Sequence, residues 1–494
     1  MGSLAKTYNQ QKRFGQVYTP SFIVKKILDD LGYVSSTILQ KTILDPACGD
    51  GRFLEEVVKR IISYSPIQDL AQNLTYVHGW DIDNEAVTLC IEKLNQLIVS
   101  HKITVNWNIR IVDAIQQLPN EKLPDESLFD YIVGNPPYIR IQHLEEAQRQ
   151  FIQQHYSFCQ RGSTDLYIAF YELGLSLLKP NGLLGYITPN TFFYTETAKA
   201  MRQAMAQRAC LKQITNYADI QVFDNVSTYS AIVILSTQPN AHFTFEQASS
   251  HTDFLKKQVA ISQLNDQKVW RLSTTQQFDN EGIKLGDICN IHVGITTLCD
   301  KAYLFAAEPI GNHYLLAKTR LAGEVRIEKG ILKPIIKAST LKLGQEKIKE
   351  YVLFPYQKVN GKHQIIPEQT LQDQFPLAYQ YLLSVKVELD KRDNGAPNAV
   401  AWYAYGRSQG LETSFGKKIL FSPMNKKPNF ILSHNEEATF YSGYCIKFDG
   451  DYDTLLEQLN SEKMDAFISV SSRDFRGGWK AYNKRVLEEF RVVM

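Results

Sequence analysis

The sequence predicts an α/β protein with a mostly parallel, doubly wound, Rossmann-like sheet and a C-terminal α+β domain. In the first half of the chain, short apolar runs with β-branched and aromatic residues alternate with segments of helical periodicity. After about Thr237 this alternation stops, and short strand-like runs with aromatic and basic residues follow. We therefore expect a first domain over residues 1–240, a connecting segment over 241–282 and a second domain over 283–494.

The composition is that of an ordinary globular protein. The chain has 494 residues, 44% of them hydrophobic and 21% charged, and a net charge of +2, so any nucleic-acid binding must depend on local basic patches. Its seven cysteines are scattered and form no CxxC pair, which predicts neither a disulfide framework nor a metal site. The sequence shows no signal-peptide pattern and no apolar run of membrane-spanning length, so we expect a cytoplasmic protein without a membrane partner.

The predicted sheet begins with a strand, a glycine loop and a helix, in the stretch KTILDPACGDGRFLEEVVKRII. Gly49 and Gly51 allow a tight turn and a close approach of the backbone to a ligand. The helix after the loop is expected to bury one apolar face, formed by Phe53, Leu54, Val57, Val58, Ile61 and Ile62. Asp45 lies just before the loop and would repel a phosphate, so the loop favours a cationic ligand that carries an amino group.

Two further strands end in acidic residues. Asp81, in TYVHGWDIDNEAV, has the usual position of an acceptor for ribose hydroxyls, and Asp83 is expected to cap the next helix. Asp113 ends a third strand in NIRIVDAIQQL. It either accepts from the adenine amino group of a cofactor, which we favour, or is a solvated strand terminus.

The fourth strand, Phe129 to Val133, leads into the tetrapeptide Asn-Pro-Pro-Tyr at 135–138. Prolines cannot extend a sheet ladder, so the chain should turn out at the strand end. The side-chain oxygen of Asn135 and the carbonyl of Pro136 can then accept both protons of an amino group on a planar ring, and Tyr138 can stack on that ring. The simpler interpretation is a proline-rich loop. Because ligands bind at the carboxyl edge of such sheets, we expect the four strand ends to meet at one site.

Two other positions are candidates for the same edge. Thr19 precedes Pro20 at the start of a predicted helix, and it is either a ligand contact or a simple cap. Phe223 lies at the loop between the two final strands, in ITNYADIQVF and TYSAIVILS. It either faces the same edge as Tyr138 or fills the core.

The motifs YTP, DPACGDG, GWDID, VDAI, NPPY, LYIAFYELGLSLLKPNG and VFDNVSTYSAIVIL occur in this order over residues 15–236. Together they resemble the gamma-class, TaqI-like adenine-amino DNA methyltransferases, which use S-adenosylmethionine. The resemblance extends more weakly to the C-terminal half, which is similar to the target-recognition domain of that family. It implies that the methionine part of the cofactor is surrounded by Thr19, Asp45, Ala47, Cys48 and Gly49.

The resemblance also implies roles for the remaining site residues. Asp81 would bind the cofactor ribose and Asp113 the cofactor adenine, although the family often has Glu at the position of Asp81. The target base would be held by Asn135, Pro136 and Tyr138, with Phe223 on its other side.

The segment SSRDFRGGWKAYNKR, residues 471–485, is a candidate DNA-binding segment of the second domain. Arg473, Arg476 and Lys480 would contact DNA, Gly477 and Gly478 permit a tight turn, and Trp479 and Tyr482 add aromatic surface. The alternative is that the segment packs on the first domain, with its basic side chains in solvent.

The function implied by the resemblance is site-specific methyl transfer to the exocyclic amino group of a flipped-out adenine in duplex DNA. Such an enzyme would act in a bacterial or archaeal cytosol, either as an orphan methylase or in a restriction-modification system with a cognate endonuclease for the same site. One alternative is a modification subunit of a larger restriction complex. Another is a protein-glutamine methyltransferase, which the long C-terminal domain argues against.

Overall fold

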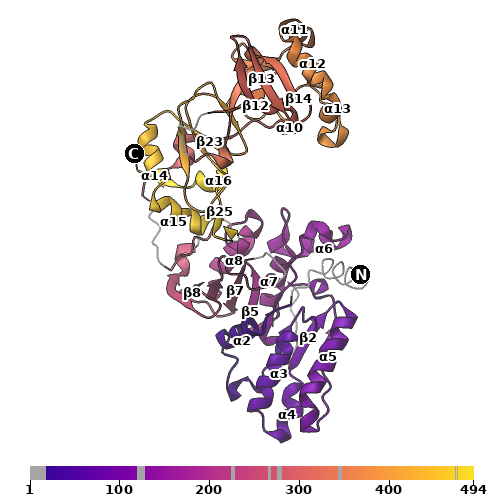
Figure 1. The fold of residues 1–494 in the computed structure, drawn as a ribbon. Coiled ribbons are helices and arrows are strands. Elements are labelled where there is room, and N and C mark those ends of the chain that lie inside the picture. The colour runs from indigo at the N-terminus through magenta and orange to yellow at the C-terminus, as the bar shows by residue number, and fades with distance from the viewer. Residues whose placement is uncertain are drawn as a thin grey trace. The chain divides into compact units, whose positions relative to one another are not determined.

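The structure, a computed structural model, describes residues 18–119, 128–223, 229–264, 269–274, 281–342, 348–472, 474–475 and 477–493. The chain forms two compact units, Met1–Gln277 and Phe278–Met494. In Figure 1 the first unit runs from indigo to magenta and the second from pink and orange to yellow. Each unit has its own hydrophobic core, so each is described separately.

In the described part of the first unit, nine strands form one sheet in the order β3-β2-β1-β4-β5-β7-β6-β8-β9. The strands are β1 (Ile43–Asp45), β2 (Val77–Asp81), β3 (Asn108–Ile111), β4 (Phe129–Gly134), β5 (Leu178–Pro189), β6 (Leu211–Asn216), β7 (Ser230–Ser236), β8 (His242–Ala248) and β9 (Phe254–Ala260). The first five pair in parallel, and β7 enters antiparallel between β5 and β6. The carboxyl ends of β1 to β4 therefore share one edge.

Helices cover both faces of this sheet, as the sequence predicts for a doubly wound fold. They are α2 (Ser21–Asp30), α3 (Arg52–Tyr64), α4 (Ile67–Leu74), α5 (Asn84–Ile98), α6 (Glu146–His155), α7 (Leu166–Leu177) and α8 (Lys199–Gln207). Neighbouring strand residues point to opposite faces, so Ile43 packs with α2, α3 and α5, whereas Leu44 packs with α6, α7 and α8. The sheet is thus buried between two helical layers.

The glycine loop between β1 and α3 depends on Gly51. This residue has a φ of 87°, and a β-carbon there would lie 2.6 Å from the sulfur of Cys90. After the loop, α3 buries Phe53, Leu54 and Val57 along the predicted apolar face. Packing on that face fixes where the loop and the end of β1 lie.

The first unit extends further along the chain than the sequence suggests. β8 pairs in parallel with β6 and β9 pairs antiparallel with β8, so much of the expected connecting segment 241–282 belongs to the sheet. One acidic side chain of this polar stretch, Glu246, lies in an ionic cluster. Glu246 is 1% exposed and binds Lys26 at 2.8 Å and Lys256 at 2.7 Å.

The second unit is an α+β assembly of small sheets. Its main sheets are β11-β23-β19-β21 and β14-β13-β12-β16-β15-β22. The strands of these two sheets are β11 (Cys289–Val293), β12 (Leu304–Ile310), β13 (Tyr314–Thr319), β14 (Gly323–Glu328), β15 (Leu332–Lys337), β16 (Glu350–Leu353), β19 (Lys418–Phe421), β21 (Phe430–Ser433), β22 (Thr439–Tyr441) and β23 (Tyr444–Phe448). The shorter strands are β10 (Ile283–Lys284), β17 (Tyr356–Val359), β18 (Lys362–Ile365), β20 (Met424–Asn425), β24 (Asp474–Phe475), β25 (Trp479–Ala481) and β26 (Arg491–Val492).

Short helices pack on these sheets. They are α9 (Leu285–Ile288), α10 (Asp300–Tyr303), α11 (Glu368–Gln374), α12 (Pro376–Ser384), α13 (Lys386–Leu389), α14 (Tyr452–Leu459), α15 (Glu462–Ser471) and α16 (Lys484–Leu487). Across the described residues of both units, the structure contains no helix with the length and apolar character needed to cross a membrane.

Candidate cofactor and substrate site

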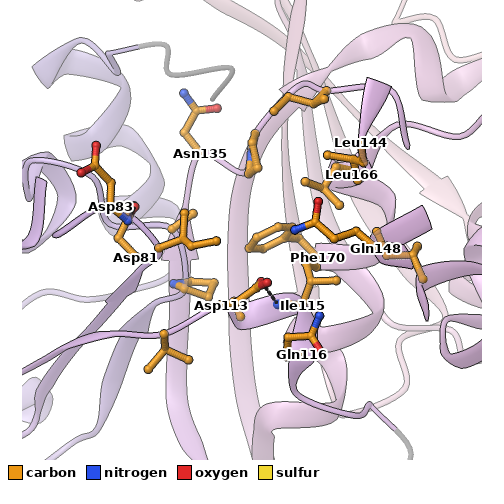
Figure 2. Close-up of a pocket in the computed structure, with 18 of the residues that line it drawn as sticks. Asp81, Asp83, Asp113, Ile115, Gln116, Asn135, Leu144, Gln148, Leu166 and Phe170 are labelled. Atoms are coloured by element: carbon orange, nitrogen blue, oxygen red, sulfur yellow. Dashed lines mark hydrogen bonds between the residues drawn. The ribbon is translucent and has the colours of Figure 1, made fainter. Parts of the chain in front are cut away.

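A cavity of about 630 Å³ opens at the carboxyl edge of the parallel strands. Asp81 is the last residue of β2, Asp113 follows β3, and Asn135 follows β4. Figure 2 shows these three side chains on one side of the cavity, with Leu144, Gln148 and Phe170 across from them.

The cavity has two contrasting walls. The strand-edge wall follows the strand ends and consists of Pro46, Ala47, Asp81, Ile82, Asp83, Val112, Asp113, Asn135 and Pro137. The helical wall comes from α6, α7 and the turn before α6, and consists of His143, Leu144, Glu145, Gln148, Ile152, Leu166 and Phe170. The sequence predicts much of the first wall, but it does not predict the second.

Asp81 is held in place by backbone amides on both of its oxygens. The N–H of Gly49 donates to Oδ2 at 2.8 Å, and the N–H of Asp83 donates to Oδ1 at 2.9 Å. Burial raises the pKa of Asp81, and these two hydrogen bonds oppose that shift by favouring the carboxylate. Gly49 therefore supports Asp81 and is not itself among the residues that line the cavity.

Asp113 lines the cavity next to a short helical turn. Its carboxylate accepts from the N–H of Ile115 at 3.1 Å and so caps the 3-10 helix η3 (Ala114–Gln116). Figure 2 marks this bond, with the Asp113 side chain beside the cavity. Asp83 likewise caps α5 through the N–H of Glu85, as predicted, and it also lines the cavity.

Asp45 lies behind the strand-edge wall. It is 1% exposed, and its Oδ1 accepts from the N–H of Ala47 at 3.1 Å. Burial raises its pKa to about 8, and the nearby charge of Asp81 adds to the shift. A β-carbon on Gly134 would lie 2.8 Å from the same oxygen, so the glycine lets β4 end directly against Asp45.

Cys48 does not present its thiol to the cavity. The side chain is 5% exposed and packs in the apolar core, where a β-carbon on Gly79 would approach its sulfur to 3.1 Å. Its N–H donates to the carbonyl of Trp80 and so joins the loop to β2. The loop leaves only Pro46 and Ala47 to line the cavity directly.

The Asn135 side chain is oriented by Thr19, which lies just before the N-terminus of α2. The Asn135 amide nitrogen donates to Oγ1 of Thr19 at 3.1 Å, and Thr19 is 4% exposed. Because Thr19 takes the nitrogen, the oxygen of the same amide is the acceptor that Asn135 can offer to a substrate amino group. Pro136 is buried, and Pro137 lines the cavity.

Tyr138 and Phe223 are in contact, but their rings pack edge to face and are not stacked in parallel. Their ring centroids are 6.4 Å apart at an angle of 71°, and the Tyr138 hydroxyl donates to the carbonyl of Ile187 at 3.1 Å. Phe223 is 2% exposed because Tyr217, Val222 and other core residues surround it. The expected slot with one ring on each face of a base is therefore absent from this arrangement of the described residues. Residues 224–228, which follow Phe223, lie outside them.

The residues that sequence reasoning missed are mainly apolar. Ile82 lines the cavity and is 53% exposed, and its signal in the sequence is only that an apolar residue stands between Asp81 and Asp83. Phe170 and Leu166 gave no such signal, because α7 is apolar on nearly every side. Among the described residues, no three His, Cys, Asp or Glu side chains gather as a metal site would require.

The candidate DNA-binding segment 471–485 runs from the end of α15 to the start of α16 and contains the antiparallel β24–β25 hairpin of the second unit. Arg473 and Arg476 lie outside the described residues, and Lys480 is half-buried on β25. Trp479 is 41% exposed with the Lys426 ammonium 5.8 Å from its ring centre. Tyr482, by contrast, is fully buried in the core of the unit, so it does not add aromatic surface as expected.

Comparison with known proteins gives the fold and site a context. Residues 60–223 match the Eco57I restriction-modification methylase family. Over this stretch the chain is similar to the Eco57I-like type II restriction-modification methylases. It is 24% identical to the type II restriction enzyme and methyltransferase RM.Eco57I of Escherichia coli, with 95% of this chain and 56% of that protein aligned. It is also 24% identical to the type II methyltransferase M.BstVI of Geobacillus stearothermophilus, with 98% and 91% aligned.

Among solved structures, the type IIL restriction-modification enzyme MmeI in complex with DNA has the same fold, with a TM-score of 0.59 and 12% identity. The alignment covers 93% of this chain and 64% of that one. The chain thus spans a little over half the length of RM.Eco57I and about two thirds of MmeI.

Proposed function

We propose that this protein transfers a methyl group from S-adenosylmethionine to the exocyclic amino group of an adenine flipped out of duplex DNA. The observation that carries the proposal is the Asn135 amide, oriented by Thr19 at the end of β4 and placed at the cavity. The relationship to type II methyltransferases supports a DNA methyltransferase of a restriction-modification system. A separate endonuclease for the same site is the partner that this assignment proposes.

The chemistry of the cavity fits the cofactor. Asp81, Asp83 and Asp113 line it, whereas none of its described lining residues is a lysine or arginine. Such a cavity favours a ligand with a positive charge, ribose hydroxyls and an amino group. In our proposal Asp81 accepts from the ribose and Asp113 from the adenine amino group, while Thr19, Asp45, Ala47, Cys48 and Gly49 position the methionine part.

When bound, S-adenosylmethionine supplies the methyl group on a sulfonium, which is already a good electrophile. The task of the protein is therefore alignment. Asn135 and the Pro136 carbonyl accept the two protons of the target amino group, which turns the nitrogen lone pair out of conjugation with the ring. After methyl transfer, the methylated amino group of the adenine loses a proton to solvent, so proton loss requires no general base.

Extraction of the base from the duplex costs a few kcal/mol, that is about 2–4 kcal/mol. Stacking on one aromatic ring contributes about 1–3 kcal/mol and offsets much of that cost. In our proposal Tyr138 provides the first ring face. Phe223 provides the second after the edge-to-face contact between the two rings opens.

The decisive experiment is to map modified bases in the DNA of a host that expresses the protein. We expect N6-methyladenine in one sequence context, absent from the same host without the gene. Methylation of a cytosine amino group in place of adenine would contradict the choice of base. No modification at all would contradict the proposed function.

The second unit is proposed to hold the DNA, with Arg473, Arg476 and Lys480 among its contacts. Replacement of Lys480 by Ala should lower the slope of log affinity against log salt by about one, since one phosphate contact is lost. Lys463→Ala, on the exposed side of the neighbouring helix α15, is the matched control and should leave the slope unchanged. Equal slopes for Lys480→Ala and wild type would assign this hairpin a structural role.

A further inference from the structure

Within α6, the side chains that line the cavity are one polar residue, Gln148, and one apolar residue, Ile152. Gln148 and Ile152 are four residues apart, so they lie on the same side of the helix, and both line the cavity. Ile152 is 1% exposed and packs against the core that includes Ala114 and Ile115. Figure 2 shows the Gln148 amide beside the Phe170 ring, directed toward the Asp113 side of the cavity.

The Gln148 amide makes no hydrogen bond within the part of the chain that the structure describes, although the residue is half-buried. Gln150, two residues further along the same helix, differs in both respects. It is exposed, and its amide nitrogen donates to Glu146 at 3.2 Å. A half-buried amide that faces a cavity without such a bond indicates a group available to a ligand.

The position of Gln148 relative to Asp113 is set by Tyr156, which directly follows α6. Tyr156 is fully buried, and its hydroxyl donates to the carbonyls of Ile115 at 2.9 Å and Gln117 at 2.7 Å. Those carbonyls belong to the turn that Asp113 caps. The end of α6 is thus bonded to the strand-edge side of the cavity, and the two polar groups face the same space.

We infer that Gln148 recognises the adenine ring of the cofactor by accepting from its amino group and donating to N7. This inference rests on the proposed function. A primary amide presents an acceptor and a donor side by side, which matches the amino group and N7 of adenine. Asp113 accepts the other amino proton, so the two residues together bind both protons of the amino group. Ile82 and Phe170 supply apolar surface around the ring.

The test is calorimetric titration of the full-length protein with S-adenosylhomocysteine and with its 7-deaza analogue, in which a C–H replaces N7. Gln148→Leu should weaken binding of S-adenosylhomocysteine about 10-fold, because it removes two hydrogen bonds at similar volume. The matched control Gln150→Leu should stay within about twofold of wild type, because its bond is solvent-exposed. The 7-deaza change should weaken binding to wild type and Gln150→Leu, but not to Gln148→Leu.

The outcomes separate this inference from the proposed function. Wild-type protein that binds both compounds equally would overturn the N7 contact without any variant being needed. Equal affinities of Gln148→Leu and wild type for S-adenosylhomocysteine would overturn it as well, with the cofactor assignment intact. Wild-type protein that binds neither compound would overturn the proposed function and this inference together.

Discussion

The two walls of the cavity differ in their chemical character and in the interactions that hold them in place. The strand-edge wall carries three carboxylates and the Asn135 amide, each held by backbone or side-chain hydrogen bonds at the end of a parallel strand or just after it. The helical wall is mainly apolar on α6 and α7, where Gln148 is the polar side chain, and it is held by packing and by the Tyr156 hydroxyl. The difference indicates that the strand ends supply the charged and hydrogen-bonding groups of the cavity, whereas the helices supply most of its apolar surface.

The largest effect is expected from Asn135→Ala on the strand-edge wall. The variant should lose about 10²–10³-fold in the rate of methyl transfer, because it removes a directed contact to the reacting group. Its affinity for S-adenosylhomocysteine should stay within a few-fold of wild type, since Asn135 is assigned to the substrate. A methylation assay beside a cofactor titration measures both quantities. Activity close to wild type would refute the amino-group contact.

A smaller effect is expected from Asp81→Ala, which removes a charged acceptor for the ribose. Affinity for S-adenosylhomocysteine should fall about 10- to 100-fold, since hydrogen bonds to charged groups are worth about 1.5–3 kcal/mol. Asp83→Ala is the comparison variant, because Asp83 lines the same cavity but serves mainly as the cap of α5. An unchanged dissociation constant for Asp81→Ala, with a loss for Asp83→Ala, would move the ribose contact to Asp83.

A still smaller effect should follow from Phe170→Leu on the helical wall. The change keeps an apolar side chain but removes the ring, and it should cost about 2- to 10-fold in affinity. Repeating the S-adenosylhomocysteine titration in low and high salt tests whether the two walls bind the ligand by different interactions. The loss in Phe170→Leu should not vary with salt, as expected for packing. A salt-dependent loss would show that this wall also acts through charge.

The last effect is on stability and not on ligand binding, and it concerns Asp45, behind the strand-edge wall. Its pKa is about 8 when folded but near the ordinary 3.8 when unfolded. Because the folded pKa is raised, the stabilising contribution of this group is fully present below pH 4 and is lost as pH rises through 8. Over that range the wild type loses up to about 1.4 kcal/mol per pH unit from this group, and Asp45→Asn does not.

The melting temperature of the cofactor-free Asp45→Asn protein should therefore exceed that of wild type by an amount that grows as pH increases. Thermal unfolding of both proteins at about pH 5 and about pH 8 measures this difference. A difference of the same size at both pH values would show that Asp45 is ionised in the folded protein.

The sequence by itself determined the strand-edge side of this protein. Parallel strands follow from apolar runs separated by helices, and their carboxyl ends must then share an edge, so Asp81, Asp113 and Asn135 could be brought together from their positions alone. The doubly wound sheet and the apolar face of α3 were predicted for the same reason, since local periodicity decides both.

Tertiary structure alone decided the rest, because burial depends on what packs from elsewhere. Phe223 and Cys48 carry side chains that suit either a ligand or a core, and both are buried in a cluster that brings together residues from Ile23 to Ala248. The polar stretch after Thr237 joins the sheet through the pairing of β8 with β6, and its buried Glu246 is paired with Lys26 on α2 and with Lys256. Gln148 faces the cavity because Tyr156 bonds α6 to a turn some 40 residues earlier, a distance at which local sequence pattern carries no information.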